Sequence, residues 1–238
     1  MNPTLMLATL RQRFTSPIRL LIVMFIGWMP MFAIVLSPRS GFATLGDGYF
    51  FALALGAGMI GQDVSSGTLP LLLARPVSRA EYVFSRWGAT AAGAFVALLL
   101  QALTAAAIML VRGAPVPWGD AGLFLANGAL TVLGAAALLA LLSSLAGGLG
   151  DIGLLLLLFL SAQVVQKIGM FKGWTWLVRA TEEFLGTLQP RLHLGPLAHG
   201  GGISWFEVVS YLSTVTLCLA LAVAVVNRKE LSYASSDH

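Results

Sequence analysis

Long apolar stretches fill most of this chain, and short polar segments separate them. A helix needs about 20 mostly apolar residues to cross the hydrocarbon core of a bilayer, so six stretches qualify as membrane spans. We expect these spans at about residues 19–37, 45–61, 84–111, 121–145, 151–168 and 205–226. The pattern predicts an all-α polytopic membrane protein, built as a single transmembrane domain over residues 1–238.

The segment in front of the first span, at about residues 4–15, has a different pattern. At helical spacing its apolar side chains share one face, which Arg11 and Arg13 leave. We expect an amphipathic helix lying in the membrane interface, with a frayed tail as the alternative. The side chains of the apolar face are Met6, Leu7, Leu10 and Phe14.

A second unusual segment, at about residues 166–204, precedes the last span. It mixes Trp174 and Trp176 with charged side chains, and tryptophan favours the headgroup level of a bilayer. We expect short interfacial or re-entrant helices here, on the outer face. Pro190 and Pro196 should end the helical character before the sixth span begins.

Composition supports the membrane assignment. The chain is 58% hydrophobic and 10% charged, whereas about a quarter of the residues of a soluble domain are charged. This leaves little sequence for a soluble domain. The single cysteine, Cys218, excludes an intrachain disulfide and is expected to be a small packing residue.

Basic residues predict the orientation, because cytoplasmic loops are enriched in lysine and arginine. With both termini in the cytoplasm, the short outer loops carry only Arg39 and Arg112. The first span lacks a cleavage pattern and should be retained. The preference for arginine over lysine, with abundant Ala, Gly and Leu, favours a prokaryotic source, and we expect the protein in the cell (inner) membrane. The residues then placed inside are Arg11, Arg13, Arg19, Arg75, Arg79, Arg86, Arg228 and Lys229.

The inner loop after the second predicted span is the most informative part of the chain. Gly67 allows a sharp redirection, and Thr68 can cap a short helix at about residues 68–76, which Pro76 ends. Ser78 and Glu81 form a capping-box pattern that should start the next helix. The short helix either anchors the loop in the interface or docks into a cytoplasmic partner.

The pattern Asp63-x-x-x-Gly67-Thr68-Leu69, followed by Leu72, Pro76-Val77-Ser78-Arg79 and a basic Arg86, resembles the permease subunits of type-2 ABC transporters. The chain departs from that family at three places. The family usually has glutamate at the position of Asp63, often an acidic residue at Pro70, and commonly Gly-Lys at Ser85-Arg86. The resemblance implies that the loop couples the spans to an ATPase. The coupling residues it implies are Asp63, Gly67, Thr68, Leu69, Leu72, Arg75, Pro76, Ser78 and Arg79.

The sequence offers no ATPase site of its own. A phosphate-binding loop needs Gly-Lys followed by Ser or Thr, and none of the lysines, Lys167, Lys172 and Lys229, follows a glycine. The resemblance therefore implies separate nucleotide-binding subunits that hold ATP and Mg²⁺. It also implies a second permease copy or a homologous permease, with the transport path between the two. No catalytic residue, cofactor, metal or nucleic-acid partner is expected for this chain.

Other classes remain as alternatives. An ion-driven transporter would place charges within its spans, but Gln101 and Asn127 are neutral and are better candidates for hydrogen bonds between helices. An intramembrane enzyme would need a nucleophile and base or a metal cluster, and His193 and His199 match no such spacing. The preferred hypothesis is an ABC exporter permease. A mechanotransmitting or maturation subunit acting on an outer-face partner is the first alternative, and a membrane scaffold or intramembrane enzyme without an ATPase is the second.

Overall fold

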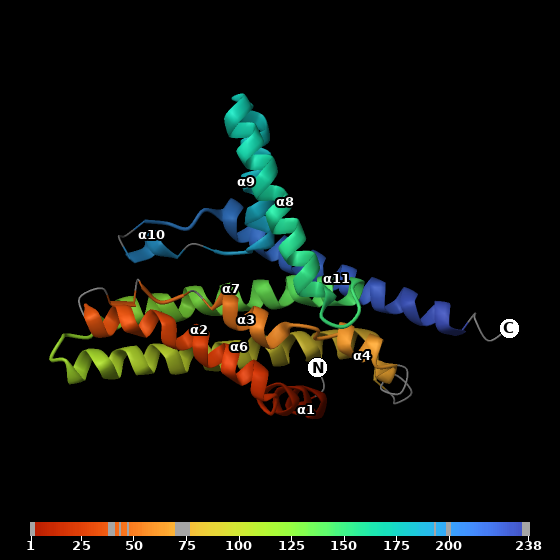
Figure 1. Ribbon diagram of the computed structural model, residues 1–238, viewed down its shortest axis with the longest axis horizontal. Coiled ribbons are helices and arrows are strands. Elements are labelled where there is room, and N and C mark those ends of the chain that lie inside the picture. Colours follow the sequence, from red (N-terminus) through yellow and green to blue (C-terminus); the bar gives the residue numbers. More distant parts are fainter. Residues whose placement is uncertain are drawn as a thin grey trace.

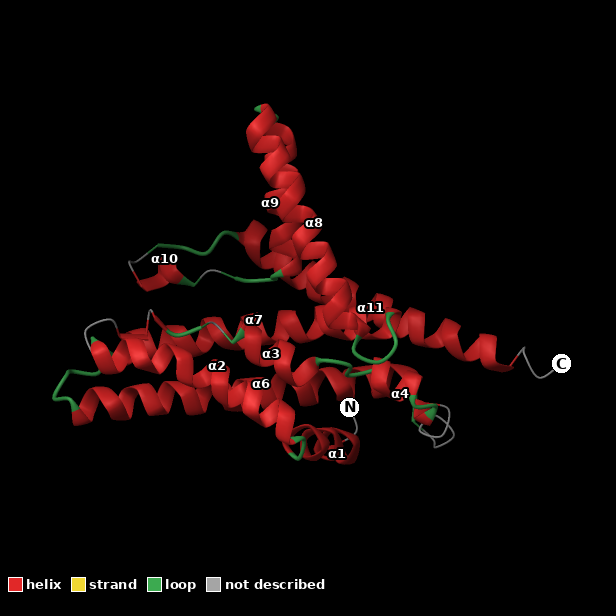
Figure 2. Ribbon diagram, in the orientation of Figure 1, coloured by secondary structure: helices red, strands yellow, loops and turns green. Residues whose placement is uncertain are grey.

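The computed structural model describes residues 3–37, 41–42, 44–46, 48–69, 77–192, 194–198 and 201–234. All regular elements in these ranges are helices, as predicted, and Figure 2 shows no strand among them. The helices are α1 (Pro3–Phe14), α2 (Pro17–Leu36), α3 (Tyr49–Gly56), α4 (Gly61–Ser65), α6 (Arg79–Val111), α7 (Trp118–Leu145), α8 (Gly150–Lys172), α9 (Thr175–Leu188), α10 (Gly195–Ala198) and α11 (Trp205–Ala234).

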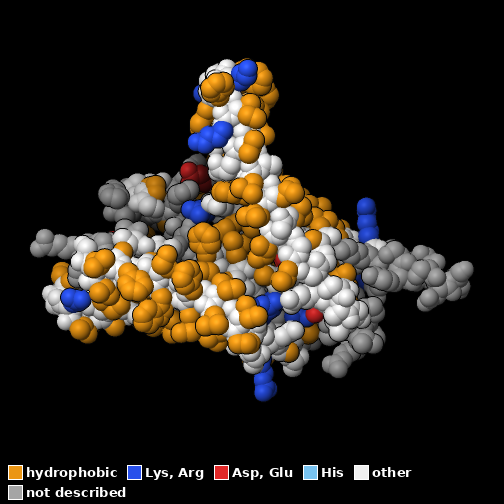
Figure 3. Space-filling model, in the orientation of Figure 1, with side chains coloured by type: hydrophobic (Ala, Val, Ile, Leu, Met, Phe, Trp, Pro, Cys, Tyr) orange, Lys and Arg blue, Asp and Glu red, His pale blue; other side chains and the backbone are white. Residues whose placement is uncertain are grey.

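The long helix α7 is the centre of the bundle. Helices α3, α6 and α11 all pack against it, and α2 covers α3 and α6 from the other side (Figure 1). The core at one end of the bundle joins Met59 and Ile60 to Tyr82 of α6, Leu139 of α7 and Ala222 of α11. This end also holds α4, the first turn of α6 and the last turn of α7. Apolar side chains cover much of the outside of the bundle, as a membrane-facing surface requires (Figure 3).

Five of the six predicted spans are present as long apolar helices. These are α2, α6, α7, α8 and residues 205–228 of α11. The expected span at 45–61 is not one continuous helix. Its main helix, α3, has eight residues and is about 12 Å long, too short to cross a bilayer. The chain turns after Gly56, with Gly58 at φ +64°, and then forms the short helix α4.

The N-terminal helix predicted at 4–15 is present as α1, which packs against α6. Leu10 and Phe14 lie against Gly93 of α6. The expected division into an apolar and a polar face is wrong in one respect, because Arg13 is only 3% exposed while Leu7 is 69% exposed. Arg13 turns towards the break after α3, where its charge finds backbone partners.

Helices α8 and α9 form an antiparallel hairpin that stands out from the side of the bundle (Figure 1). Gly173, at φ +71°, makes the turn between them, and Gly169 lies against Leu177 and Val178 of α9. The predicted outer segment therefore contains the end of α8, then α9 and α10. The chain returns to the bundle at Leu188, whose carbonyl accepts a 3.0 Å hydrogen bond from the Tyr49 hydroxyl. Two histidines of this segment, His193 and His199, lie outside the described residues.

Helix α6 begins as the capping-box pattern predicted. Ser78 is its N-cap, with extended backbone, and its Oγ accepts a 3.2 Å hydrogen bond from the backbone N–H of Glu81. The cap satisfies one of the backbone donors that a helix start leaves without a partner. It thereby sets where the chain after residues 70–76 enters the bundle.

Replacing Ser78 by alanine is expected to lower the free energy of unfolding by about 1 kcal/mol, because the cap bond is lost. Ser78→Asp should keep most of the stability, since aspartate caps helices equally well. Thermal unfolding of the purified protein in detergent measures both changes. Equal losses in the two variants would contradict the capping role.

Candidate functional site

The break between α3 and α4 leaves backbone groups without helical partners in an apolar surrounding. Each such group costs free energy when it is buried and unpaired. Polar side chains from α1, α2, α7 and α8 converge on this break and pair with those groups. The break and these side chains together form the candidate site.

The junction between α7 and α8 supplies one side of the site. The backbone N–H of Gly58 donates to Asp151 Oδ2 at 2.6 Å. Ser143 Oγ accepts from the N–H groups of Ile60, at 3.0 Å, and Gly61, at 2.9 Å. The N–H of Gly148 donates to the Gly61 carbonyl at 2.7 Å. These bonds fix the start of α4 to the end of α7 and the first turn of α8.

Two arginines from the N-terminal helices supply the opposite side. The carbonyl of Ala57 accepts from Arg13 Nη1 at 2.6 Å and from Arg19 Nη2 at 3.1 Å. Arg19 Nη2 also donates to Gln62 Oε1 at 3.0 Å. Helices α1 and α2 are therefore tied to the same turn that α7 and α8 hold.

A buried ion pair joins α4 to α6. Asp63 is 8% exposed, and its Oδ2 accepts from Arg86 Nη2 and from the Tyr82 hydroxyl. The Arg86 guanidinium also lies over the Tyr82 ring, 5.5 Å from its centroid. Arg86 Nη1 donates to Thr9 Oγ1 of α1 at 3.1 Å. Asp63 is therefore an internal link between three helices, and its carboxylate does not face the surface.

The first residues of the predicted coupling helix leave directly from this ion pair. Gly67 has φ +67° and redirects the chain, as expected. The Thr68 hydroxyl donates back to the Asp63 carbonyl at 3.3 Å, and Leu69 is buried in the core beside Tyr82. The rest of the predicted helix, including Leu72, Arg75 and Pro76, lies outside the described residues.

The site carries an excess of positive charge. It contains three arginines, Arg13, Arg19 and Arg86, and two carboxylates, Asp63 and Asp151. Burial, followed by repulsion from Arg19 and Arg86, lowers the pKa of Arg13 to about 9. Arg13 is still a cation at pH 7, and its Nε has no hydrogen-bond partner among the described residues.

The structure brings together some predicted residues and adds others. Asp63, Gly67, Thr68 and Leu69 belong to the site, and Ser78 and Arg79 stand at the start of α6. Gln101 lies elsewhere, where its Nε2 donates to the Gly27 carbonyl of α2 at 3.3 Å. The Asn127 side-chain oxygen is buried without a partner among the described residues.

Sequence reasoning had assigned no role at this site to Tyr82, Ser143 or Asp151, and it had placed Arg13 on a polar face. The signal that could have identified Asp151 and Arg86 is an ionisable residue at the end of an apolar run, which is costly unless it is paired. The described part of the chain holds no group of three or more His, Cys, Asp or Glu side chains suited to a metal ion. The arrangement is suited to holding helices in register.

Comparison with known proteins agrees with the membrane architecture. The model of a family described as ABC-2 family transporter protein matches residues 4–231. No curated protein matches the chain, and no solved structure matches it. The family match runs from α1 through most of α11 and so includes every residue of the candidate site. The chain is therefore a multi-pass membrane protein of the ABC-2 transporter permease family.

Proposed function

We propose that this chain is the membrane-spanning permease subunit of an ATP-driven exporter. Two copies, or this chain with a similar one, form the transport path and bind separate nucleotide-binding subunits. ATP and Mg²⁺ are held by those subunits, and this chain carries no ATPase site and no cofactor. The observation that carries the proposal is the position of the buried ion pair. It links the start of segment 68–76 to α1 and α6, in a chain that belongs to the ABC-2 family.

In this proposal the hydrogen bonds and the ion pair of the candidate site transmit force. A partner that moves segment 68–76 pulls on Thr68, which is bonded to the Asp63 carbonyl. Asp63 passes the displacement to Arg86 of α6, and the α3–α4 break passes it to α7 and α8. The ATPase subunits would favour one of two helix arrangements by binding one arrangement more tightly.

The distribution of basic side chains supports a cytoplasmic position for this end of the bundle. Arg11, Arg19 and Arg79 lie at the end that holds α4, and Arg112 lies at the opposite end of α6. Positive charge is enriched on the cytoplasmic side of membrane proteins. Both termini are then cytoplasmic and the protein resides in a prokaryotic inner membrane.

The α8–α9 hairpin favours a second candidate function. It stands out from the bundle and carries both exposed apolar side chains, such as Leu160, and charged ones, such as Glu183 (Figure 3). A surface of this kind could act on a partner protein while ATP hydrolysis moves the end of the hairpin that joins the bundle. The chain would then be a mechanotransmitting or maturation subunit.

Co-purification with an ATPase encoded beside this gene tests the proposed function. Arg79 is exposed beside segment 68–76, and Arg79→Glu is expected to weaken the complex about tenfold, through repulsion of an acidic partner surface. Arg112→Glu, at the opposite end of α6 and also exposed, is the matched control and should leave binding intact. ATP hydrolysis by the reconstituted complex, with and without this chain, gives the second readout. An ATPase that neither binds nor responds to this chain would favour the scaffold or enzyme alternative.

A further inference from the structure

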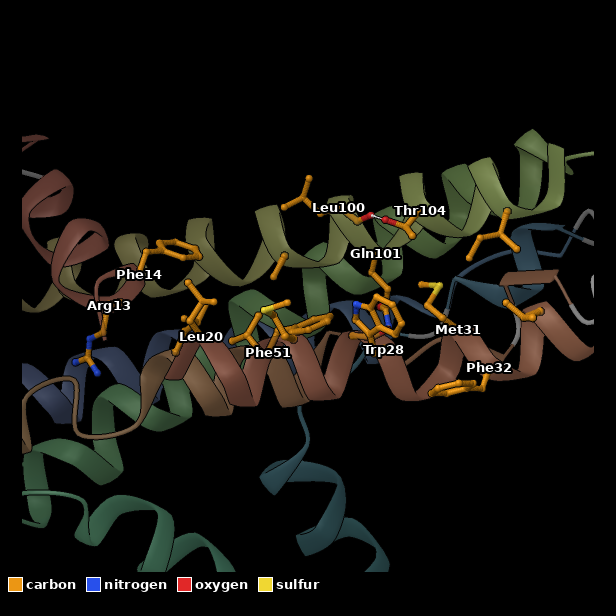
Figure 4. A pocket seen from close by; sticks show the side chains of 17 residues that line it. Arg13, Phe14, Leu20, Trp28, Met31, Phe32, Phe51, Leu100, Gln101 and Thr104 are labelled. Carbon is orange, nitrogen blue, oxygen red and sulfur yellow. Dashed lines mark hydrogen bonds between the residues drawn. The ribbon is translucent and has the colours of Figure 1, made fainter. Parts of the chain in front are cut away.

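An apolar groove of about 520 Å³ runs between α2 and α6 and has α3 as its floor (Figure 4). Its volume falls within the range of about 300–1,000 Å³ that is typical of small-ligand sites. Of the residues that line the groove, Arg13 also belongs to the candidate site. Its apolar wall is formed by Leu20, Val23, Met24, Trp28, Phe51 and Leu100, among others.

One end of this groove carries the positive charge of Arg13. Arg13 lies at that end, beside Phe14, while Trp28 and Phe32 line the part farther along α2 (Figure 4). Arg13 and Arg19 share a single carbonyl partner, Ala57, so two guanidinium groups meet here. The nearby Asp63 is already occupied by Arg86. The arginines around this end of the groove therefore outnumber the carboxylates. One buried N–H, at Arg13 Nε, has no partner among the described residues.

We propose that the groove binds an anionic phospholipid. Its phosphate lies at Arg13, and one acyl chain lies along α2 and α6. The lipid comes from the leaflet on the side of α1, because α1 carries Arg13 at that end of the bundle. An anion at Arg13 would offset the repulsion among Arg13, Arg19 and Arg86, which Asp63 and Asp151 compensate only in part. The acyl chain would fill a surface that is otherwise open between two helices.

Gln101 distinguishes the proposed acyl chain from a more polar ligand. Gln101 lines the groove and is buried. Its Nε2 donates a hydrogen bond to the Gly27 carbonyl, while its Oε1 has no partner among the described residues. An acyl chain has no donor for that oxygen. A ligand with a hydroxyl or amide along its length would bond to it. Gln101→Leu is therefore expected to keep or strengthen lipid binding.

Native mass spectrometry of the full-length chain in a non-ionic detergent measures the binding of defined lipids. The first dioleoyl phosphatidylglycerol is expected to bind about fivefold to tenfold more tightly than the first dioleoyl phosphatidylcholine. Arg13→Gln should abolish this preference. Arg11→Gln removes the same charge from an exposed position of the same helix and should retain it.

A second pair of variants tests the acyl-chain groove and leaves Arg13 in place. Thr104→Trp fills the groove and should weaken the binding of both lipids. Leu103→Trp adds the same side chain to an exposed face of α6 outside the groove and should change neither. This pair remains informative if Arg13→Gln fails to fold.

Three results would overturn the proposal. Equal loss of preference in Arg11→Gln and Arg13→Gln would indicate general surface charge. Release of the lipid by inorganic phosphate alone would indicate an anion site without an acyl-chain groove. Loss of lipid binding in Gln101→Leu would indicate a polar ligand instead. None of these measurements involves an ATPase, so they stand or fall independently of the transport role.

Discussion

Replacing Arg86 by methionine is expected to lower the free energy of unfolding by about 3–5 kcal/mol, because it leaves the buried Asp63 carboxylate without its cation. Asp63 is 8% exposed, and of its partners among the described side chains it would keep the Tyr82 hydroxyl alone. The same substitution removes the bond from Arg86 to Thr9 and so loosens α1. Thermal or denaturant unfolding in detergent measures the loss.

A double-mutant cycle separates the ion pair from the rest of the network. Asp63→Asn combined with Arg86→Met should be less destabilising than the sum of the single losses, by about 1–3 kcal/mol, since the double variant leaves no unpaired charge. Arg228→Met, at an exposed position on α11, controls for the loss of an arginine as such. Strict additivity of the two single variants would contradict a direct energetic link between Asp63 and Arg86.

The second large effect is expected at Gly61. A Cβ atom there would lie 2.6 Å from the Ala146 carbonyl oxygen and 2.7 Å from that of Gly148. Both are backbone atoms, so the contact cannot be relieved by a rotamer change. Gly61→Ala is therefore expected to cost about 1–3 kcal/mol and to part α4 from the α7–α8 junction. In the reconstituted complex it should uncouple ATP hydrolysis from transport.

Gly147→Ala is the matched control for this substitution. Gly147 belongs to the same junction, but a Cβ atom there meets nothing within 4 Å. The two variants should differ clearly in thermal stability and in hydrogen exchange of the amides of Ile60 and Gly61, which donate to Ser143. Similar behaviour of both variants would show that the close contact at Gly61 is not what positions α4.

Local signals in the sequence were enough to predict much of the fold. Five spans, the helix at α1 and the N-cap at Ser78 follow from hydropathy and capping chemistry, which act between neighbouring residues. The break after α3 was missed because residues 45–61 are almost all apolar, and hydropathy does not distinguish a continuous helix from a turn held by distant side chains. The groups that stabilise the turn, Ser143 and Asp151, are more than 80 residues away in the chain.

The candidate site was predicted only in part for the same reason. The family pattern includes Asp63, the residues that follow it and a basic residue at Arg86, but it does not predict that Asp63 and Arg86 pair. Arg13 was expected on the polar face because helical spacing places it away from Leu7, Leu10 and Phe14. Its burial depends on the free carbonyl of Ala57, which exists only because α3 ends one residue earlier.

The bond between Asp151 and Gly58 has a mechanical consequence for the hairpin. Asp151 lies in the first turn of α8, a helix of 23 residues that is about 35 Å long and is held by the bundle mainly at its base. A rotation of about 10° at that base would carry the tip of the hairpin through about 6 Å, by the geometry of a rigid rod of that length. Displacements too small to repack the bundle would thus be amplified at Gly173, the far end of the rod.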